Sequence, residues 1–210
     1  MTHATGGLFS GAEIMVSEIA TEILAFWFDD PTAPESEYGQ ERRLWFHKDP
    51  AFDQQVRERF LTIYEQARQG IYDGWQQTPQ GALALIILFD QFPRNMFRGT
   101  PKSFEADSQA LAIAQRVIAQ GGDRALIPVE RMFLYLPFEH SENMDHQNQA
   151  VALFEALIQE IPALHSTLDY AHRHRDVIAR FGRFPHRNDS LGRTSTPAEE
   201  AFLAQPGSRF

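Results

Sequence analysis

The chain has 210 residues, of which 43% are hydrophobic and 22% are charged, a composition typical of one globular domain with a buried core. It contains no cysteine, which excludes disulfide bonds, thiolate metal sites and a cysteine nucleophile. Its 19 Lys and Arg residues and 28 Asp and Glu residues give a net charge of −9, so no nucleic-acid partner is expected.

No segment has the pattern of a membrane span or a secretory signal. The longest apolar run is Ala82 to Phe89, whereas a helix that crosses a bilayer needs about 20 such residues. The first residues lack a basic stretch followed by an apolar one. We therefore expect a cytoplasmic protein without membrane contact, in which residues 1–16 form a flexible leader and residues 17–210 form one domain.

In the first half of the chain, apolar residues repeat at three- and four-residue spacing, which predicts helices. Ser17 is a candidate N-cap for the first helix, and Gly70 is expected to end a helix that begins near Phe52. Thr78 and Pro79 are a cap and a first helical position, so a helix with apolar residues on all sides should begin there.

The second half of the chain shows the same spacing. Pro137 is expected to stop a helix that begins at Pro128, and Thr196 to cap a short last helix. Other helices are expected at 104–118, 145–161 and 162–181. Since no stretch alternates with period two for long enough to predict a strand, the expected fold class is all-α: a single domain of about eight helices without a sheet.

The aromatic pairs Trp27–Phe28 and Trp45–Phe46 are expected in the core.

Two segments echo each other: FDQFPRN, which contains Pro93, and FGRFPHRN, which contains Pro185. Both prolines are expected to end a helix within about two residues, because proline lacks a backbone donor and restrains the residue before it. The echo indicates either two similar helix-stop turns or two turns that present Arg94 and Arg187 to one site.

Residues 171–193 carry six arginines and only two aspartates within a chain that is acidic overall. Arginine binds carboxylate or phosphate through paired hydrogen bonds and stays charged at neutral pH. The neighbouring Phe184 should draw Arg183 and His186 into a groove. The other interpretation is a solvated helix face whose arginines pair with surface acids.

A second polar cluster, Glu139 to Glu142, follows the expected helix stop. Glu139 and His140 are the parts of a general acid–base pair, since histidine titrates near neutral pH. Alternatively, Ser141 or Asn143 caps the next helix, and the two interpretations are compatible.

No cofactor and no metal are expected. The sequence lacks HExxH and di-iron ExxH patterns, a GxSxG elbow and a glycine-rich phosphate loop. His172 and His174 are two residues apart and would not face one another on a helix.

Several motifs together carry a family resemblance: FWF, LALIILFDQFPRN, FRGTPKSFEAD, PFEHSE, FGRFPHRN, LGRTSTPAEEAFL and PGSRF. From about Ser17 to Phe210 the chain resembles a bacterial family of unknown function, DUF family 924, and the combination of DQFPRN with RFGRFPHRN is highly specific. That family is similar in fold to tetratricopeptide-like proteins, so the resemblance implies stacked antiparallel helix pairs. It implies no established activity.

The leading hypothesis is a binding protein whose groove, formed by DQFPRN, PFEHSE and FGRFPHRN, holds an anionic small molecule or an acidic peptide. One alternative is a hydrolase or transferase of a phosphorylated or carboxylated metabolite, in which Glu139 and His140 transfer protons. The other is a protein–protein scaffold of the helical-repeat type. The residues predicted to bind the ligand are Asp90, Phe92, Arg94, Asn95, Glu142, Arg183, Phe184, His186, Arg187 and Asn188.

Overall fold

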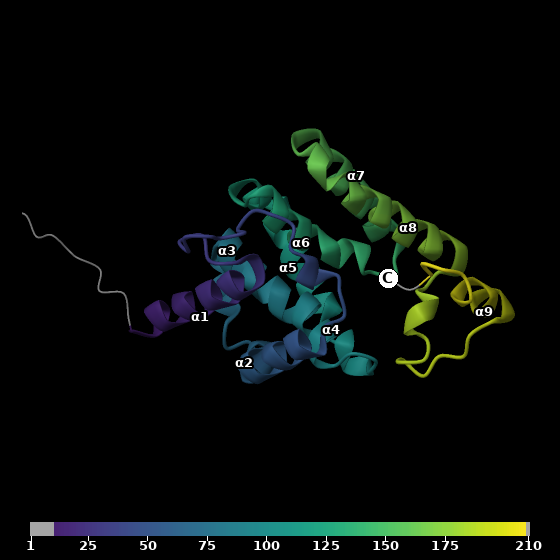
Figure 1. Cartoon of the computed structure of the whole chain (residues 1–210), viewed down its shortest axis with the longest axis horizontal. Coiled ribbons are helices and arrows are strands. Elements are labelled where there is room, and N and C mark those ends of the chain that lie inside the picture. The colour runs from purple at the N-terminus through teal and green to yellow at the C-terminus, as the bar shows by residue number, and fades with distance from the viewer. Residues whose placement is uncertain (1–10, 209–210) are drawn as a thin grey trace, which may run out of the picture.

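The computed structural model of the protein describes residues 11–208, and all regular structure in this range is helical. A π-helical stretch, Ile87–Gln91, joins α3 to α4 without a break, so the described residues contain eight continuous helices besides short 3-10 turns. This confirms the predicted all-α class. The helices are α1 (Gly11–Phe28), α2 (Pro50–Arg68), α3 (Pro79–Ile86), α4 (Phe92–Met96), α5 (Asp107–Ala119), α6 (Pro128–Glu139), α7 (Met144–Glu160), α8 (His165–Phe181) and α9 (Pro197–Leu203) (Figure 1).

Several helix starts follow from local hydrogen bonding, as predicted. The Thr78 hydroxyl accepts from the Gly81 N–H at 3.1 Å, with Pro79 at the first helical position of α3. Thr196 and Glu199 form a reciprocal capping box at α9. The first helix differs from the prediction: it begins at Gly11, so the expected cap Ser17 lies inside it. Of the expected leader, residues 11–16 are helical and residues 1–10 lie outside the described range.

The predicted helix stops at Pro93 and Pro137 are wrong, because helix continues through both prolines. Before Pro93 the helix widens into the π-helical stretch, which changes the backbone pairing where proline can neither donate a hydrogen bond nor fit a regular turn. The prediction at Pro185 is also wrong. α8 ends earlier, at Phe181, because Gly182 adopts a left-handed conformation with φ +69°.

Helices that follow one another in sequence pack together from α5 to α8, and the apolar helix α3 lies centrally against α1, α5 and α6 (Figure 1). Every residue of α3 from Gly81 to Ile86 is buried, as its apolar sequence predicts. Phe46 corrects the expected aromatic core: it is 64% exposed, whereas its neighbour Trp45 is buried.

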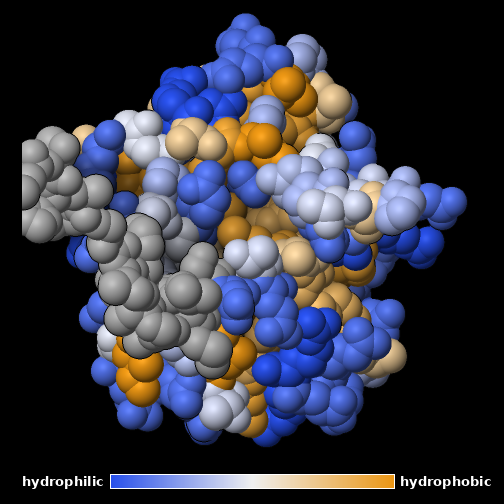
Figure 2. Space-filling model, turned by 90° about the vertical axis from the view of Figure 1, so that its left-hand side faces the viewer, coloured by the Kyte–Doolittle hydropathy of each residue, from blue (hydrophilic) through white to orange (hydrophobic). Residues whose placement is uncertain are grey.

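The C-terminal segment (182–208) adds a small second core. Phe184 packs with Val177 and Ile178 of α8, and Phe202 of α9 covers them from outside. Figure 1 shows this segment beyond the end of α8. The opposite face of the molecule, in Figure 2, is mostly hydrophilic with apolar residues reaching the surface between polar ones. Among the described residues, no helix has both the length and the apolar composition needed to span a membrane.

Candidate functional site

The π-helical stretch places a carboxylate in the interior. Asp90 is fully buried, and its Oδ1 lies 2.6 Å from Nδ1 of His140, which follows directly after α6. Arg94, one turn later, places Nη1 3.4 Å from the same oxygen and also donates to the Asp90 backbone carbonyl. Burial alone would raise the pKa of Asp90, but Arg94 and His140 lower it to about 2. Asp90 is therefore ionised at neutral pH.

The arginines of the two echoing segments meet at one carboxylate, that of Asp107 in the first turn of α5. Arg94 binds it in bidentate fashion, with Nη1 and Nη2 each 3.0 Å from a different carboxylate oxygen. Arg187 approaches the Oδ2 of Asp107 with its Nη1, at 3.4 Å. Asp107 thus joins Arg94, 13 positions before it, and Arg187, 80 positions after it, in a single ion network.

Arg187 is unusually buried for an arginine, with 7% of its surface exposed. Its guanidinium carbon lies 4.6 Å from the ring centroid of Phe184 and 4.7 Å from that of Phe104, so two aromatic rings flank the charge. The Nε atom is buried and has no hydrogen-bond partner within residues 11–208. Burial, followed by repulsion from Arg94, lowers the pKa of Arg187 to about 10.

Glu139 and His174 form a second carboxyl–imidazole pair beside the first. Glu139 is 3% exposed, and its Oε1 lies 3.0 Å from Nδ1 of His174 in α8. Its Oε2 has no hydrogen-bond partner in the described part of the chain. Burial and the nearby charge of Asp90 raise the pKa of Glu139 to about 8, so Glu139 is mostly protonated at neutral pH.

Three histidines from three elements converge here. The ring centroids of His140 and His174 are 6.3 Å apart, and Phe184 packs against His174 at 5.4 Å and against His186 at 5.5 Å. Burial is the largest cause that lowers the pKa of each, so all three are neutral at pH 7. We call these side chains together the polar cluster: Asp90, Arg94, Asp107, Glu139, His140, His174, His186 and Arg187.

Three of the predicted ligand-binding residues lie away from the polar cluster. Phe92 is fully buried in the aromatic core, with its ring centroid 4.7 Å from that of Phe60. Asn95 donates to Asp53 at 2.7 Å, on the side of α2. Arg183 forms a bidentate pair with Glu199 at 2.6 and 2.8 Å, which ties α9 to the end of α8.

Two other predicted residues hold the second turn in place. Glu142 accepts from the Phe184 N–H at 2.8 Å and from both terminal nitrogens of Arg193. Asn188 accepts from Arg193 Nε at 3.0 Å and donates to Ser195 at 3.0 Å. These bonds position Phe184 and Arg187 at the polar cluster. Of the capping candidates, Asn143 caps α7 by accepting from the Asp145 N–H at 2.8 Å.

Sequence reasoning missed three contributors: Phe104, Asp107 and His174. Phe104 and Asp107 stand in the motif FRGTPKSFEAD, which carries the family resemblance but did not suggest a site. His174 lies in the basic segment, and its pairing with Glu139 cannot be read from the sequence around it. An acid near two arginines in space is not visible in a sequence that separates them.

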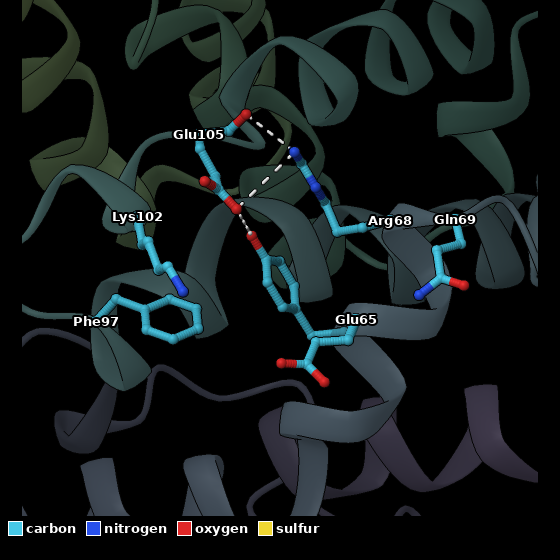
Figure 3. A pocket seen from close by; sticks show the side chains of 7 residues that line it. Glu65, Arg68, Gln69, Phe97, Lys102 and Glu105 are labelled. Atoms are coloured by element: carbon cyan, nitrogen blue, oxygen red, sulfur yellow. Dashed lines mark hydrogen bonds and ion pairs between the residues drawn. The ribbon is translucent and has the colours of Figure 1, made fainter.

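A surface pocket of about 270 Å³ is lined by residues of the ranges 64–69 and 97–105 (Figure 3). In it, Tyr64 donates to Glu105 at 3.3 Å, while Lys102 lies over the ring of Phe97. None of its lining residues belongs to the polar cluster. No group of three or more His, Asp or Glu side chains placed to hold a metal ion occurs among the described residues.

The fold and site define an all-helical protein with a buried network of arginines, carboxylates and histidines. The model of a family described as bacterial protein of unknown function, DUF924, matches residues 23–207, and the chain belongs to this family. A solved structure of a protein of unknown function from Agrobacterium tumefaciens is 38% identical, has a TM-score of 0.76, and covers 90% of this chain and 98% of its own. The comparison with curated proteins finds no match.

Proposed function

We propose that this protein binds an anionic small molecule, a carboxylate or a phosphate, at the guanidinium groups of Arg187 and Arg94. The observation that carries the proposal is the state of Arg187, which is buried between two aromatic rings with one long contact to a carboxylate already shared with Arg94. A cytoplasmic location and tetratricopeptide-like packing of helix pairs remain predictions from the sequence.

A buried charge is costly unless it is paired and hydrogen-bonded. Arg94 has a bidentate carboxylate, but Arg187 has five N–H donors and a single contact at 3.4 Å to Asp107. A bound carboxylate or phosphate offers the missing acceptors in the geometry that a guanidinium prefers. It would also reduce the repulsion between the two arginines. The surroundings of Arg187 therefore favour an anion over a neutral or cationic ligand.

Ligand-dependent thermal unfolding tests the proposal. Sulfate, inorganic phosphate and succinate are compared with chloride at matched ionic strength. An anion at a hundred times its Kd adds about 2.7 kcal/mol of stability, which raises Tm by roughly 5–10 °C in a chain of this size. Sulfate and phosphate also stabilise proteins by exclusion from their surface. The relevant quantity is therefore the part of the anion-dependent increase in Tm that is lost in Arg187→Gln.

Arg98→Gln is the matched control, because Arg98 pairs with Asp53 at 2.8 Å but is outside the polar cluster. It should keep the full anion-dependent increase in Tm. If wild type and Arg187→Gln show equal increases, Arg187 binds no anion and the proposal is wrong. Should Arg187→Gln fail to fold, Arg187→Lys replaces it as the test variant, because it retains the charge but loses the planar guanidinium group. Calorimetric titration of the wild type with sulfate then shows directly whether the anion binds.

The Asp90–His140 pair favours a second candidate, an enzyme acting on the same anion. An ionised carboxylate that holds one imidazole nitrogen orients the other as a general base, as in many hydrolases. Hydrolysis of p-nitrophenyl phosphate or p-nitrophenyl acetate, lost in His140→Gln and retained in the exposed-histidine variant His47→Gln, would support this candidate. Turnover that is equal in both variants would contradict it.

A further inference from the structure

His140 is connected to the arginines through shared carboxylates. Its Nδ1 and the Nη1 of Arg94 lie 2.6 and 3.4 Å from the same atom, Oδ1 of Asp90. Arg94 in turn shares Asp107 with Arg187. An anion bound at the two guanidinium groups therefore lies in the neighbourhood of the His140 ring.

The position of Asp90 determines which imidazole nitrogen is available. Because the ionised Asp90 carboxylate can only accept, the Nδ1 atom 2.6 Å away carries the hydrogen and donates it. Nε2 of the neutral ring is then a lone-pair acceptor, and it has no hydrogen-bond partner among the described residues. The side chain is 14% exposed. Nε2 is thus the ring atom open to a ligand, but it can donate to an anion only after it gains a proton.

The charges of the polar cluster balance before any ligand binds. The two arginines pair with two aspartate side chains, Glu139 is mostly protonated, and the histidines are neutral. An anion adds negative charge to a buried, balanced site, where interactions between charges are strong. Uptake of a proton restores the balance, and a histidine is the group that can take one near neutral pH.

Among the three histidines, His140 has the surroundings that best stabilise the charged ring. Asp90 binds it directly, whereas His174 faces the mostly protonated Glu139, and His186 lies beside the cation Arg187. In the ligand-free protein, burial and Arg94 hold the pKa of His140 below its usual value despite Asp90 and Asp107. A bound anion counteracts the effect of Arg94 and so raises that pKa.

We infer that His140 is a third ligand-binding residue of the anion site, and that its Nε2 takes up one proton and donates it in a hydrogen bond to the bound anion. The inference rests on the proposed function. It defines the ligand class further, as a carboxylate or phosphate with an oxygen free to accept from an imidazolium. It also makes the affinity of the site increase as pH falls, since binding and proton uptake are linked.

Calorimetric titration with sulfate tests this inference, because sulfate stays fully ionised across the range and contributes no pH dependence of its own. Wild-type affinity should rise by up to about tenfold per pH unit from about pH 8 to about pH 6. Titrations in two buffers of different ionisation enthalpy should report uptake of one proton per sulfate. His140→Gln should bind sulfate with a flat pH profile.

His47→Gln is the matched control, because His47 is exposed and outside the polar cluster, and it should keep the wild-type profile. Sulfate binding that requires Arg187 but shows no proton uptake in the wild type would overturn the role of His140 and leave the proposed function standing. The same holds if His140→Gln keeps the wild-type pH dependence. Absence of sulfate binding by the wild type throughout the pH range would contradict the proposed function itself. The buffer comparison needs only the wild type, so an absence of proton uptake overturns the role of His140 even if His140→Gln fails to fold.

Discussion

The two segments FDQFPRN and FGRFPHRN share their phenylalanines and proline but differ in backbone. In the first, Asp90 continues the helix through Pro93 within a π-helical stretch. In the second, Gly182 occupies the position equivalent to Asp90, adopts a left-handed conformation and ends α8 before Pro185. The residue at this position contributes to the difference, because glycine enters the left-handed region at little cost and aspartate does so less readily.

The shared phenylalanines also have different surroundings. Phe92 is part of the main aromatic core, whereas Phe184 packs against Arg187 and His174. What the two segments have in common in space is their arginine, since Arg94 and Arg187 both contact Asp107. The echo in sequence thus corresponds to a shared charge partner and not to a shared turn.

The largest expected effect comes from removing that shared partner. Asp107→Asn removes the carboxylate that Arg94 shares with Arg187 and leaves the buried Arg187 guanidinium without an ion-pair partner among the described residues, so the free energy of unfolding should fall by about 3–5 kcal/mol. Glu22→Gln, which breaks the half-exposed pair with Arg59, should change it by less than about 1 kcal/mol. Urea unfolding measures both variants. Equal losses would mean that Asp107 is not the link between the two segments.

A smaller effect on stability should distinguish the buried carboxyl group of Glu139 from that of Glu142. Because the pKa of Glu139 is raised to about 8 from 4.5, its contribution to stability is complete below about pH 4.5 and is lost as pH rises to 8. The variant Glu139→Gln has no group that titrates at this position, so it does not lose this stability as pH rises. The free energy of unfolding of the variant, relative to wild type, should therefore increase by about 1.4 kcal/mol per pH unit between about pH 6 and 8.

Glu142→Gln is the control for this pH dependence. Arg193 and the Phe184 N–H lower the pKa of Glu142 despite its partial burial. The contribution of Glu142 to stability is therefore fully present above the ordinary pKa of a glutamate, and it is lost only as pH falls below that value. The effect of Glu142→Gln should therefore be constant between about pH 6 and 8. A Glu139→Gln profile that is equally flat would contradict the burial argument for Glu139.

The smallest effect concerns the helix end itself. Gly182→Ala should destabilise the protein by about 1–2 kcal/mol, since an added Cβ meets no atom within 4 Å and only the left-handed backbone opposes it. Gly182→Asn should cost less, because asparagine tolerates this conformation better. Gly74→Ala, also without a neighbour within 4 Å but without positive φ, should be neutral or slightly stabilising. Thermal unfolding compares the stability of the three variants. A loss of stability in Gly74→Ala as large as in Gly182→Ala would contradict the explanation from backbone conformation.

Parts of the site were accessible from sequence, and the limits have physical causes. One of the two interpretations of the echo is that Arg94 and Arg187 are presented to one site, and in the structure both contact Asp107. Arg183 looked equivalent to Arg187 by composition, yet it forms an ion pair with Glu199 of α9. The partner of a side chain at a helix end depends on tertiary contacts, which composition does not specify.

The helical class and several helix starts follow from local sequence, because apolar spacing and capping hydrogen bonds act over a few residues, as at Thr78 and Thr196. In contrast, the helix through Pro93 and the contact of Asp107 with two distant arginines depend on tertiary packing. Those outcomes depend on burial: a proline or a charge is tolerated in the interior when the surrounding packing and hydrogen bonds offset its cost. The residues that provide this packing and these hydrogen bonds come from distant segments, which only the fold brings together.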